Sequence, residues 1–199
     1  MSDPVPSPTK GERTRQALLG AAIARFGRDG YRRTSVADVA RDVGLSTTAA
    51  YAYFPNKGSL FVAAVDEDAA MEIEEGMALL AERGVMDDMR SILPVFMERL
   101  DHHPLARRVL AGLEPEFTVR LIGIPALEQL RKGMAEHLTA QQLSGEVRPD
   151  VDPRRMANGI VGLLLSLLMS LVQTGTEPID VLADDVIAVF QAALRPPSG

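Results

Sequence analysis

The chain has 199 residues, 46% of them hydrophobic, and contains no cysteine. It can therefore bury a sizeable core, but disulfides, thiolate metal sites and a cysteine nucleophile are excluded. The net charge is −6, yet residues 1–60 hold nine Lys and Arg against five Asp and Glu, so the rest of the chain is strongly acidic. This asymmetry is typical of a protein in which one part meets phosphates, although an excess of this size also occurs as ordinary surface variation.

The N-terminal residues 1–9 contain three prolines and no apolar stretch. They predict a disordered arm rather than a secretion signal. The longest apolar run, IVGLLLSLLMSLV at 160–172, is shorter than the roughly 18 to 20 residues that cross a membrane, and is interpreted as a buried helix of a soluble protein. We therefore expect a cytoplasmic protein without a membrane partner.

Two capped helices are predicted at the start of the ordered chain. Apolar residues at helical spacing predict a first helix over about 10–28, with Gly30 as its stop. Ser35, followed three residues later by Asp38, is typical of a capping box and predicts a second helix through Asp42. The acidic residue near the helix start also suits the positive end of the helix dipole.

The next segment predicts a helix-turn-helix. Ser46 is a cap for a third helix over 47–53. Two helices joined by a tight turn need a small residue where they touch and a residue that tolerates positive φ in the turn. Ala40 and Gly44 occupy these two positions.

The third helix begins with the small residues Thr47, Thr48 and Ala49. Small side chains let a helix backbone approach base edges, and threonine can hydrogen-bond to bases or contact a thymine methyl group. Any surface helix can also carry Thr and Ala, so these residues alone leave both interpretations open.

The stretch GYRRTSVADVARDVGLSTTAAYAYFPNKGSL, residues 30–60, resembles the tetracycline-repressor (TetR) family of transcriptional regulators. The resemblance implies base contacts by the third helix, and phosphate contacts by Tyr51 and Lys57 among others. The chain departs from the family pattern at Thr48, Ala49 and Gly58, where members often have Gly, Ser or Thr, and Glu. The predicted DNA-binding residues are Arg33, Thr34, Ser35, Ser46, Thr47, Thr48, Ala49, Tyr51, Tyr53 and Lys57. A core position is the alternative for Tyr53, and a solvated loop is the alternative for Arg33.

The remainder predicts an all-α body, so the expected fold class is all-α. The expected domains are a helix-turn-helix domain over 10–56 and a helical effector-binding and dimerisation domain over 57–195, followed by a tail over 196–199. Further helices are expected near 60–83, 87–101, 104–112, 115–122, 125–143, 153–173 and 179–194. Prolines stand at the expected first turns of four of them: Pro104, Pro115, Pro125 and Pro153. Pro94 lies inside a predicted helix and predicts a kink or a break.

Methionines and aromatics in the central helices predict a pocket for a small, largely apolar effector. Methionine adapts to irregular apolar ligands, although it also fills gaps in ordinary cores. The resemblance implies a small-molecule site among these helices. The predicted pocket residues are Met71, Met89, Leu93, Phe96, Met97, Leu100, Phe117, Met134, His137, Leu138, Leu164 and Leu168.

Small residues recur along one side of the apolar helix at 153–173, which predicts close contact with another helix. Pairing of the last two helices with their symmetry mates would give a four-helix dimer interface, as the resemblance also implies, whereas burial within one subunit is the alternative. The predicted interface residues are Gly159, Gly162, Leu163, Ser166, Ser170, Ile187 and Phe190.

An enzyme is the competing class. Asp101, His102 and His103 could suggest a metal site, but adjacent side chains at a helix junction point in different directions. The sequence contains no glycine-rich phosphate loop, metalloprotease motif or nucleophile elbow. We therefore expect no catalytic residue, no metal and no cofactor. The expected function is a homodimeric DNA-binding regulator, in the first instance a repressor released from a palindromic operator by the effector. A DNA-binding protein without an effector and a metal-dependent helical enzyme are the alternatives.

Overall fold

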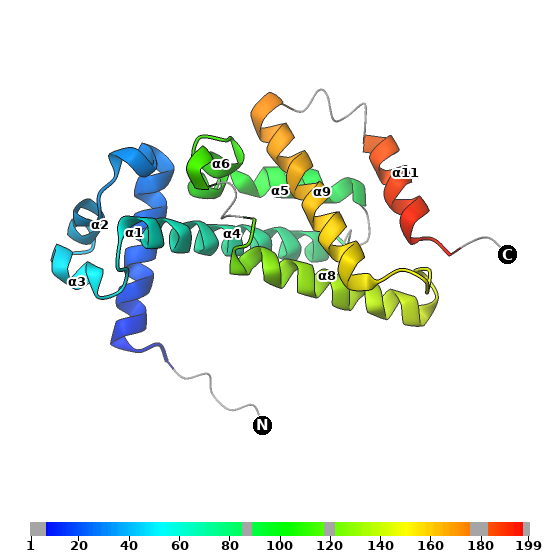
Figure 1. Ribbon diagram of the computed structural model, residues 1–199, viewed down its shortest axis with the longest axis horizontal. Helices are drawn as coiled ribbons and strands as arrows, with labels where there is room; N and C mark the ends of the chain where they lie inside the picture. The colour runs from blue at the N-terminus through cyan, green and yellow to red at the C-terminus, as the bar shows by residue number, and fades with distance from the viewer. Residues whose placement is uncertain (1–6, 85–88, 118–121, 176–182, 197–199) are drawn as a thin grey trace.

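The computed structural model describes residues 7–84, 89–117, 122–175 and 183–196, and within these ranges it contains helices and no strand. Three helices form a unit at one end, called the head: α1 (Lys10–Arg33), α2 (Val36–Asp42) and α3 (Thr47–Tyr51). α4 (Lys57–Glu82) leaves the head and runs through the larger part, called the body (Figure 1). The predicted all-α fold is confirmed.

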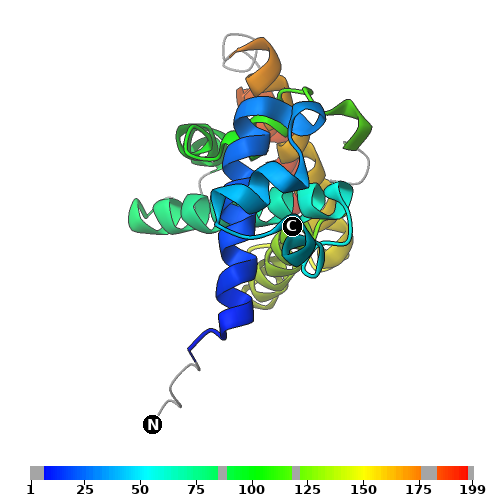
Figure 2. The same ribbon diagram turned by 90° about the vertical axis from the view of Figure 1, so that its left-hand side faces the viewer.

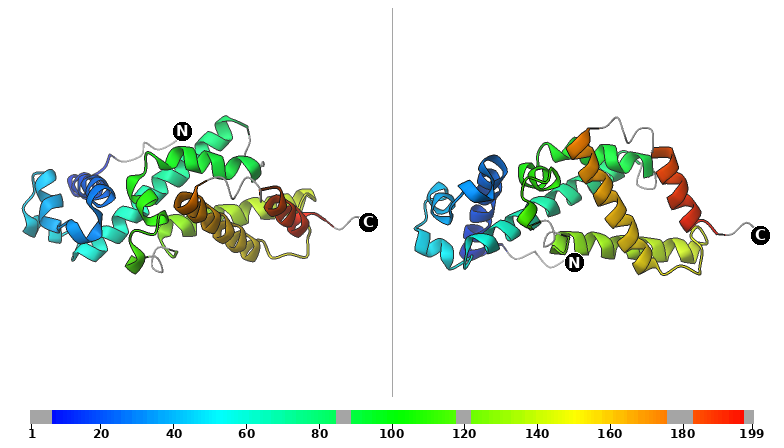
Figure 3. Two further views of the ribbon diagram at one scale, coloured as in Figure 1. Left: turned by 90° about the horizontal axis from the view of Figure 1, so that it is seen from above. Right: turned by 45° about the horizontal axis from the view of Figure 1, so that its top comes forward.

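Besides α4, the described residues of the body form five helices and one 3-10 turn. They are α5 (Met89–Leu100), α6 (Pro104–Leu110), the 3-10 turn η1 (Pro115–Phe117), α8 (Pro125–Ser144), α9 (Pro153–Thr174) and α11 (Ala183–Leu194). The molecule is elongated, with the head at one end and the C-terminal end of α11 at the other (Figure 3). Figure 2 looks onto the head, where α2 and α3 lie nearest the viewer and so form its outer end.

Local caps begin five of the described helices. Each cap is a side-chain oxygen that accepts a backbone N–H of the first turn, which has no partner inside its own helix. The caps are Thr9, Ser35, Ser46, Asn56 and Asp152, with donor-to-acceptor distances between 2.8 and 3.2 Å, and those at Ser35 and Ser46 confirm the prediction. Pro104, Pro125 and Pro153 stand at the first position of α6, α8 and α9.

The helix-turn-helix geometry is also confirmed. Ala40 is fully buried where α2 meets α3, and Gly44 takes a φ of +69° in the turn. The N–H of Leu45 donates to the Ala40 carbonyl at 2.8 Å, which closes the turn. Because φ is positive at Gly44, an L side chain there would be strained.

Several predicted helix boundaries are corrected. α1 extends to Arg33 as a second short helical stretch, but Gly30 (φ +81°, ψ 168°) is not helical and interrupts it, so the predicted stop of the first helical stretch at Gly30 is confirmed. α3 ends at Tyr51 rather than at residue 53. The helix predicted over 115–122 is only the short turn η1 in its described part, and residues 118–121 lie outside the described ranges.

Of the kink or break predicted at Pro94, the break is wrong, and the kink stays a prediction. α5 runs through Pro94 as one helix. The proline is exposed and lies near the helix start, so it removes one backbone hydrogen bond without disturbing the core. Packing on both sides holds the helix in place: Val95 is buried, and a Cβ built on Gly76 of α4 would lie 2.9 Å from the Phe96 ring.

Two helices of the body are capped by a different helix. Neither His103 nor Ile124, which precede the first prolines of α6 and α8, makes a side-chain cap. Instead Asp68 of α4 accepts the N–H groups of Leu105 and Ala106 at 2.9 and 2.8 Å. Asp66 of α4 accepts the N–H of Ala126 at 2.8 Å. α4 thus fixes the starts of α6 and α8 through two carboxylates.

The head core joins head and body. It is formed by Leu18, Leu19, Phe26, Val39, Ala50 and Phe61 together with Leu105, Phe117 and Ile124 of the body. The aromatic rings of Tyr31, Phe61 and Phe117 meet with centroids 4.4 to 5.1 Å apart. Each large apolar side chain buried in this way stabilises the fold by about 1.5 to 3 kcal/mol.

Candidate nucleic-acid interface

The exposed side of α3 presents small polar and apolar groups. Ser46 accepts the N–H of Ala49 at 3.2 Å and so sets the helix start. Thr48 is exposed, Thr47 and Ala49 are half-buried, and Ala50 turns into the head core. α3 therefore has a buried face that fixes it and a face of short side chains that allows close approach to a flat or grooved partner.

Two predicted DNA-binding residues belong to the core and are corrected. Thr34 is only 2% exposed, and its hydroxyl donates to the Gly30 carbonyl at 3.0 Å, so its side chain is not available to a phosphate. Tyr53 is half-buried and packs against the head core. Tyr51, by contrast, is 47% exposed at the end of α3.

The cap residue Ser35 is exposed but engaged. Its hydroxyl accepts the N–H of Asp38 at 3.1 Å and donates to the Asp38 carboxylate at 2.6 Å. The hydrogen bond from the Ser35 hydroxyl to the carboxylate is the main cause that holds the pKa of Asp38 below its ordinary value. Ser35 is therefore the structural cap of α2, and a phosphate contact there would have to share its hydroxyl oxygen.

The cations of the head fall into two groups. Four form ion pairs: Arg25 with Asp42, Arg28 with Asp29, Arg41 with Asp38, and Arg32 with Glu116. The hydrogen bond from Arg25 holds the pKa of Asp42 below its ordinary value, so this pair stays charged and internally neutral. Within the described residues no ion pair engages the others, which are Lys10, Arg13, Arg15, Arg33 and Lys57. This second group can meet phosphates.

Arg15 is a candidate that sequence reasoning missed. Its guanidinium carbon lies 5.2 Å from the centroid of the Phe54 ring, which follows α3 in the chain. The contact places a cation of α1 beside the end of α3. The N-terminal charge excess was the only sequence signal, because pairing across the head is a tertiary feature.

Lys57 sits between the head and α4. Its Nζ lies 4.3 Å from the centroid of the Tyr31 ring and 3.4 Å from the Arg32 carbonyl oxygen. The side chain is half-buried at the first position of α4, whose N–H groups also favour an anion. Lys57 can therefore stabilise the joint and still present its charge to a phosphate.

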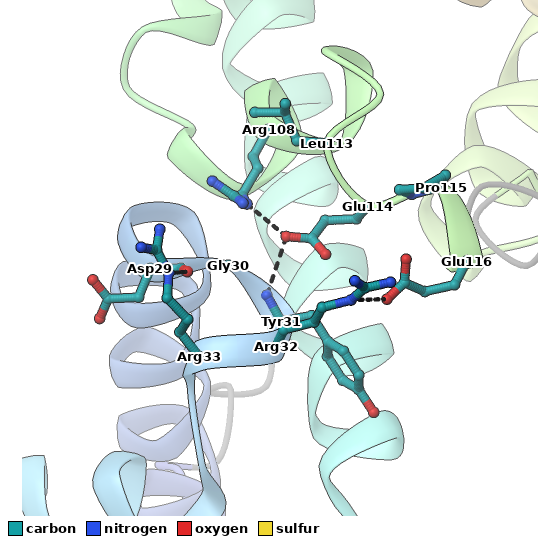
Figure 4. A pocket seen from close by; sticks show the side chains of 10 residues that line it. All are labelled: Asp29, Gly30, Tyr31, Arg32, Arg33, Arg108, Leu113, Glu114, Pro115 and Glu116. Atoms are coloured by element: carbon teal, nitrogen blue, oxygen red, sulfur yellow. Dashed lines mark hydrogen bonds and ion pairs between the residues drawn. The ribbon is translucent and has the colours of Figure 1, made fainter.

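A cleft of about 430 Å³ lies at the joint between head and body (Figure 4). The head contributes Asp29, Gly30, Tyr31, Arg32 and Arg33, and the body contributes Arg108, Leu113, Glu114, Pro115 and Glu116. Charges of both signs line this cleft, so it is a structural joint rather than an obvious anion site.

Glu114 bridges this joint. Although it is only 4% exposed, one carboxylate oxygen accepts the Tyr31 N–H at 3.0 Å and the Arg108 Nε–H at 2.6 Å (Figure 4). Gly30 makes the approach possible, because a Cβ there would lie 2.4 Å from the Arg108 guanidinium and φ is +81°. The carboxylate thus ties the head to α6.

The predicted pocket residues are divided among separate clusters. Leu93, Phe96, Met97, Leu100 and Leu168 pack in one cluster between α5, α6 and α9, called the α6 cluster. Met134, Leu138 and Leu164 pack in another between α8, α9 and α11, called the α8 cluster. A single pocket lined by all the predicted residues is therefore wrong.

Three predicted pocket residues lie elsewhere, and a fourth is not described. Phe117 belongs to the head core, where it contacts the Tyr31 and Phe61 rings. Met71 is 37% exposed on α4, and His137 is exposed on α8. The side chain of Met89 lies outside the described residues.

α9 has one buried face and one exposed apolar face. Its buried side chains are Ala157, Ile160, Val161, Leu168 and Leu171. Gly159, Ser166 and Ser170 are exposed, and Leu163 is 52% exposed. The interpretation of 160–172 as a buried helix thus holds for one face only. By length and composition α9 is the one helix in the described ranges that could cross a membrane, a test that core helices also pass.

α9 and α11 lie on the same broad side of the body (Figures 1 and 3). In α11, Val189 is 64% exposed and Ile187 is half-buried. Phe190, predicted at the interface, is corrected: it is 5% exposed and packs in the α8 cluster of its own chain.

The described residues contain no group of three or more His, Asp or Glu side chains arranged to hold a metal ion. His102 is exposed, whereas His103 is buried and faces Asp68. The two adjacent histidines therefore point to different surroundings.

These features define a DNA-binding protein of the helix-turn-helix class. Residues 18–64, from the middle of α1 to the first turns of α4, match the family model of bacterial regulatory proteins of the tetR family. The HTH-type transcriptional repressor AcnR of Corynebacterium diphtheriae is 30% identical over 74% of this chain and 75% of its own. The uncharacterised HTH-type regulator YdgC of Bacillus subtilis is 24% identical over 94% of this chain and 96% of its own.

The whole chain also resembles solved structures. A TetR-family transcriptional regulator from Mesorhizobium loti, itself described as putative, superposes with a TM-score of 0.67 at 25% identity, covering 94% of this chain and 100% of the other. The chain belongs to the TetR family and is a transcriptional regulator. The predicted family is thereby confirmed.

Proposed function

We propose that the protein is a homodimeric repressor that binds a palindromic operator through α3 and is released by a largely apolar small molecule. The observation that carries the proposal is the exposed face of α3, on which Thr47, Thr48 and Ala49 stand beside Tyr51. Two such helices would enter successive major grooves about 34 to 36 Å apart. Gel-shift titration against fragments selected from a random-sequence pool tests the proposal.

The proposed DNA contacts divide by chemistry. Thr47, Thr48 and Ala49 face bases, while Tyr51, Arg33, Arg15 and Lys57 face phosphates. Ser35 and Ser46 act mainly as caps that orient the backbone of α2 and α3. Phosphate contacts fix position and base contacts give specificity, so the two groups have different signatures in binding experiments.

Lys57→Met is expected to weaken binding to every DNA sequence and to lower the slope of log affinity against log salt by about 1, because one phosphate contact is lost. Methionine retains an apolar stem over the Tyr31 ring. Tyr51→Phe is expected to weaken binding about 10-fold with an unchanged slope, since it removes a hydrogen bond but no charge. Fluorescence anisotropy over a range of salt concentrations measures both quantities.

The control is Lys132→Met, which removes an exposed charge from α8, far from the head in sequence. It should leave both affinity and slope unchanged. A Lys57→Met protein with the wild-type salt slope would show that Lys57 meets no phosphate.

The proposed effector site is the α6 cluster. It packs directly against α6, and α6 contacts the head through Arg108 and Glu114. A ligand can release DNA only by favouring a conformation in which the two heads are wrongly placed. The α6 cluster supports the proposal because a displacement of its side chains would shift α6, and this short helix contacts the head.

Titration of apolar compounds into the free protein and into its operator complex tests this site. A regulatory compound is expected to bind the complex about 5- to 150-fold more weakly, since the coupling is reciprocal. Met97→Trp should abolish the response by filling the cluster, whereas Leu143→Trp, at a position 87% exposed on α8, should not. Equal affinities for free and DNA-bound protein would exclude regulation by that compound.

A further inference from the structure

A set of ionisable groups is buried where α4, α5 and α6 meet. Asp68 and Glu72 of α4 are 1% and 4% exposed, and His103, just before α6, is 3% exposed. Glu75 of α4 and Arg99 of α5 complete the set and form an ion pair at its edge. Buried charges normally have partners, because an unpaired charge in an apolar interior is strongly destabilising.

Asp68 orients the ring of His103. Its Oδ1 lies 3.1 Å from His103 Nδ1, while its Oδ2 accepts two N–H groups of α6. A carboxylate that faces Nδ1 favours the tautomer with the hydrogen on Nδ1. The other ring nitrogen, Nε2, then turns toward Glu72 and Glu75, at 3.5 and 3.4 Å from their carboxylate oxygens.

Four polar atoms in this set have no hydrogen-bond partner. They are both carboxylate oxygens of Glu72, Nε2 of His103 and Nε of Arg99. Because Glu72 and His103 are only 4% and 3% exposed, bulk solvent reaches them poorly. One proton between Nε2 of His103 and the carboxylate of Glu72 would give one atom on each side a hydrogen-bond partner. Without this proton, the lone pair of the neutral ring nitrogen faces the negative charge of the carboxylate.

We infer that Glu72 and His103 share a single proton that locks α4 to the start of α6, and that losing it weakens operator binding. The inference rests on the proposed function for its effect on DNA, but the proton site itself does not. α6 lies directly against α1, since a Cβ on Gly27 would be 2.8 Å from Pro104 Cβ. Pro104 directly follows His103, so a shift of His103 also moves the residue that contacts α1 of the head.

The electrostatic surroundings support Glu72 as the proton-binding carboxylate. Burial, the largest cause, together with the negative charges of Asp68 and Glu75 raises the pKa of Glu72 to about 7, against the opposing effects of His103 and Arg99. The hydrogen bond from Arg99 holds the pKa of Glu75 below its ordinary value, so Glu75 stays ionised. These groups come from α4, α5 and the link to α6.

The sign of the pH effect follows from the raised pKa. The folded chain holds this proton more tightly than the unfolded chain, so its stabilising contribution is complete below about pH 4.5 and is lost as the pH rises to about 7. Between pH 5 and pH 8 this one group should lower the urea midpoint by about 1 M.

Glu72→Gln is the central test, because the amide can donate to Nε2 at any pH. At fixed salt, wild-type operator affinity should fall at least about 5-fold between pH 6 and pH 8, and most of that fall should be absent in Glu72→Gln. The control Glu74→Gln changes an exposed glutamate of the same helix and should follow the wild type. A Glu72→Gln protein with the wild-type pH dependence of both affinity and urea midpoint would overturn the inference.

Infrared difference spectroscopy gives a readout that requires neither DNA binding nor a stable variant. Lowering the pH of wild-type protein through neutrality should produce the carbonyl band of a buried protonated carboxylic acid or the ring bands of a protonated imidazole. Neither band set changing in that interval would refute the shared proton. If both the urea and infrared results are as expected while no operator is bound, the proton site stands and the proposed DNA function fails.

Discussion

Gly162→Arg is expected to convert the proposed dimer into monomers and to lower operator affinity at least about 100-fold, because two linked heads gain this much from simultaneous binding. Gly162 lies on α9 beside Leu163, which is 52% exposed in the single chain. No heavy atom lies within 4 Å of a Cβ built on Gly162. A side chain at this position can therefore leave the backbone without a clash at its Cβ, and the expected damage is to the packing of a second chain.

Sedimentation velocity and gel-shift assays on the same samples measure this effect. Gly133→Arg is the matched control, since Gly133 is also a helical glycine with no heavy atom within 4 Å of its built Cβ, but it lies on α8. The control should remain a dimer and bind DNA normally. A dimeric Gly162→Arg protein with full operator affinity would place the interface on another surface.

Asp68→Ala is expected to lower the free energy of unfolding by about 3 to 5 kcal/mol, the usual result of removing one partner from a buried charged set. The substitution leaves the Leu105 and Ala106 N–H groups without acceptors and frees His103 Nδ1. Asp66→Ala removes a single, partly buried cap of α8 and should have a smaller effect of about 1 kcal/mol.

Urea unfolding of the two variants at the same protein concentration and pH gives the comparison. Circular dichroism at one pH near neutrality follows the unfolding of both variants. The two losses can be compared directly, because both aspartates belong to α4 and each caps the start of another helix. Equal losses in the two variants would mean that Asp68 acts only as an ordinary helix cap and that its burial with His103 adds nothing.

The head could be predicted because its information is local. Ser35 and Asp38 are three residues apart and cap α2 through each other, and Gly44 supplies the positive φ of the turn. Interactions of this range depend on side-chain type and spacing, which the sequence displays directly. The same short range explains why the predicted cap Ser46 is confirmed at the start of α3.

Burial was harder to predict than helix formation. An apolar or hydroxyl residue at helical spacing shows that a face is suited to packing, but not which neighbour covers it. Thr34, which the sequence predicts at the DNA, is buried. Phe117, predicted in the effector pocket, joins the head core, and Phe190, predicted at the dimer interface, packs within its own chain.

The sequence by itself determined an all-α chain with a helix-turn-helix at residues 36–51, and it showed which helix faces are apolar and which are polar. Only the tertiary structure decided how head and body are coupled. Asp66 and Asp68 cap α8 and α6 from positions 60 and 37 residues away, and Glu114 reaches Tyr31 across 83 residues. Such contacts form because burial leaves a backbone N–H without water, so whichever acceptor the fold brings near must satisfy it.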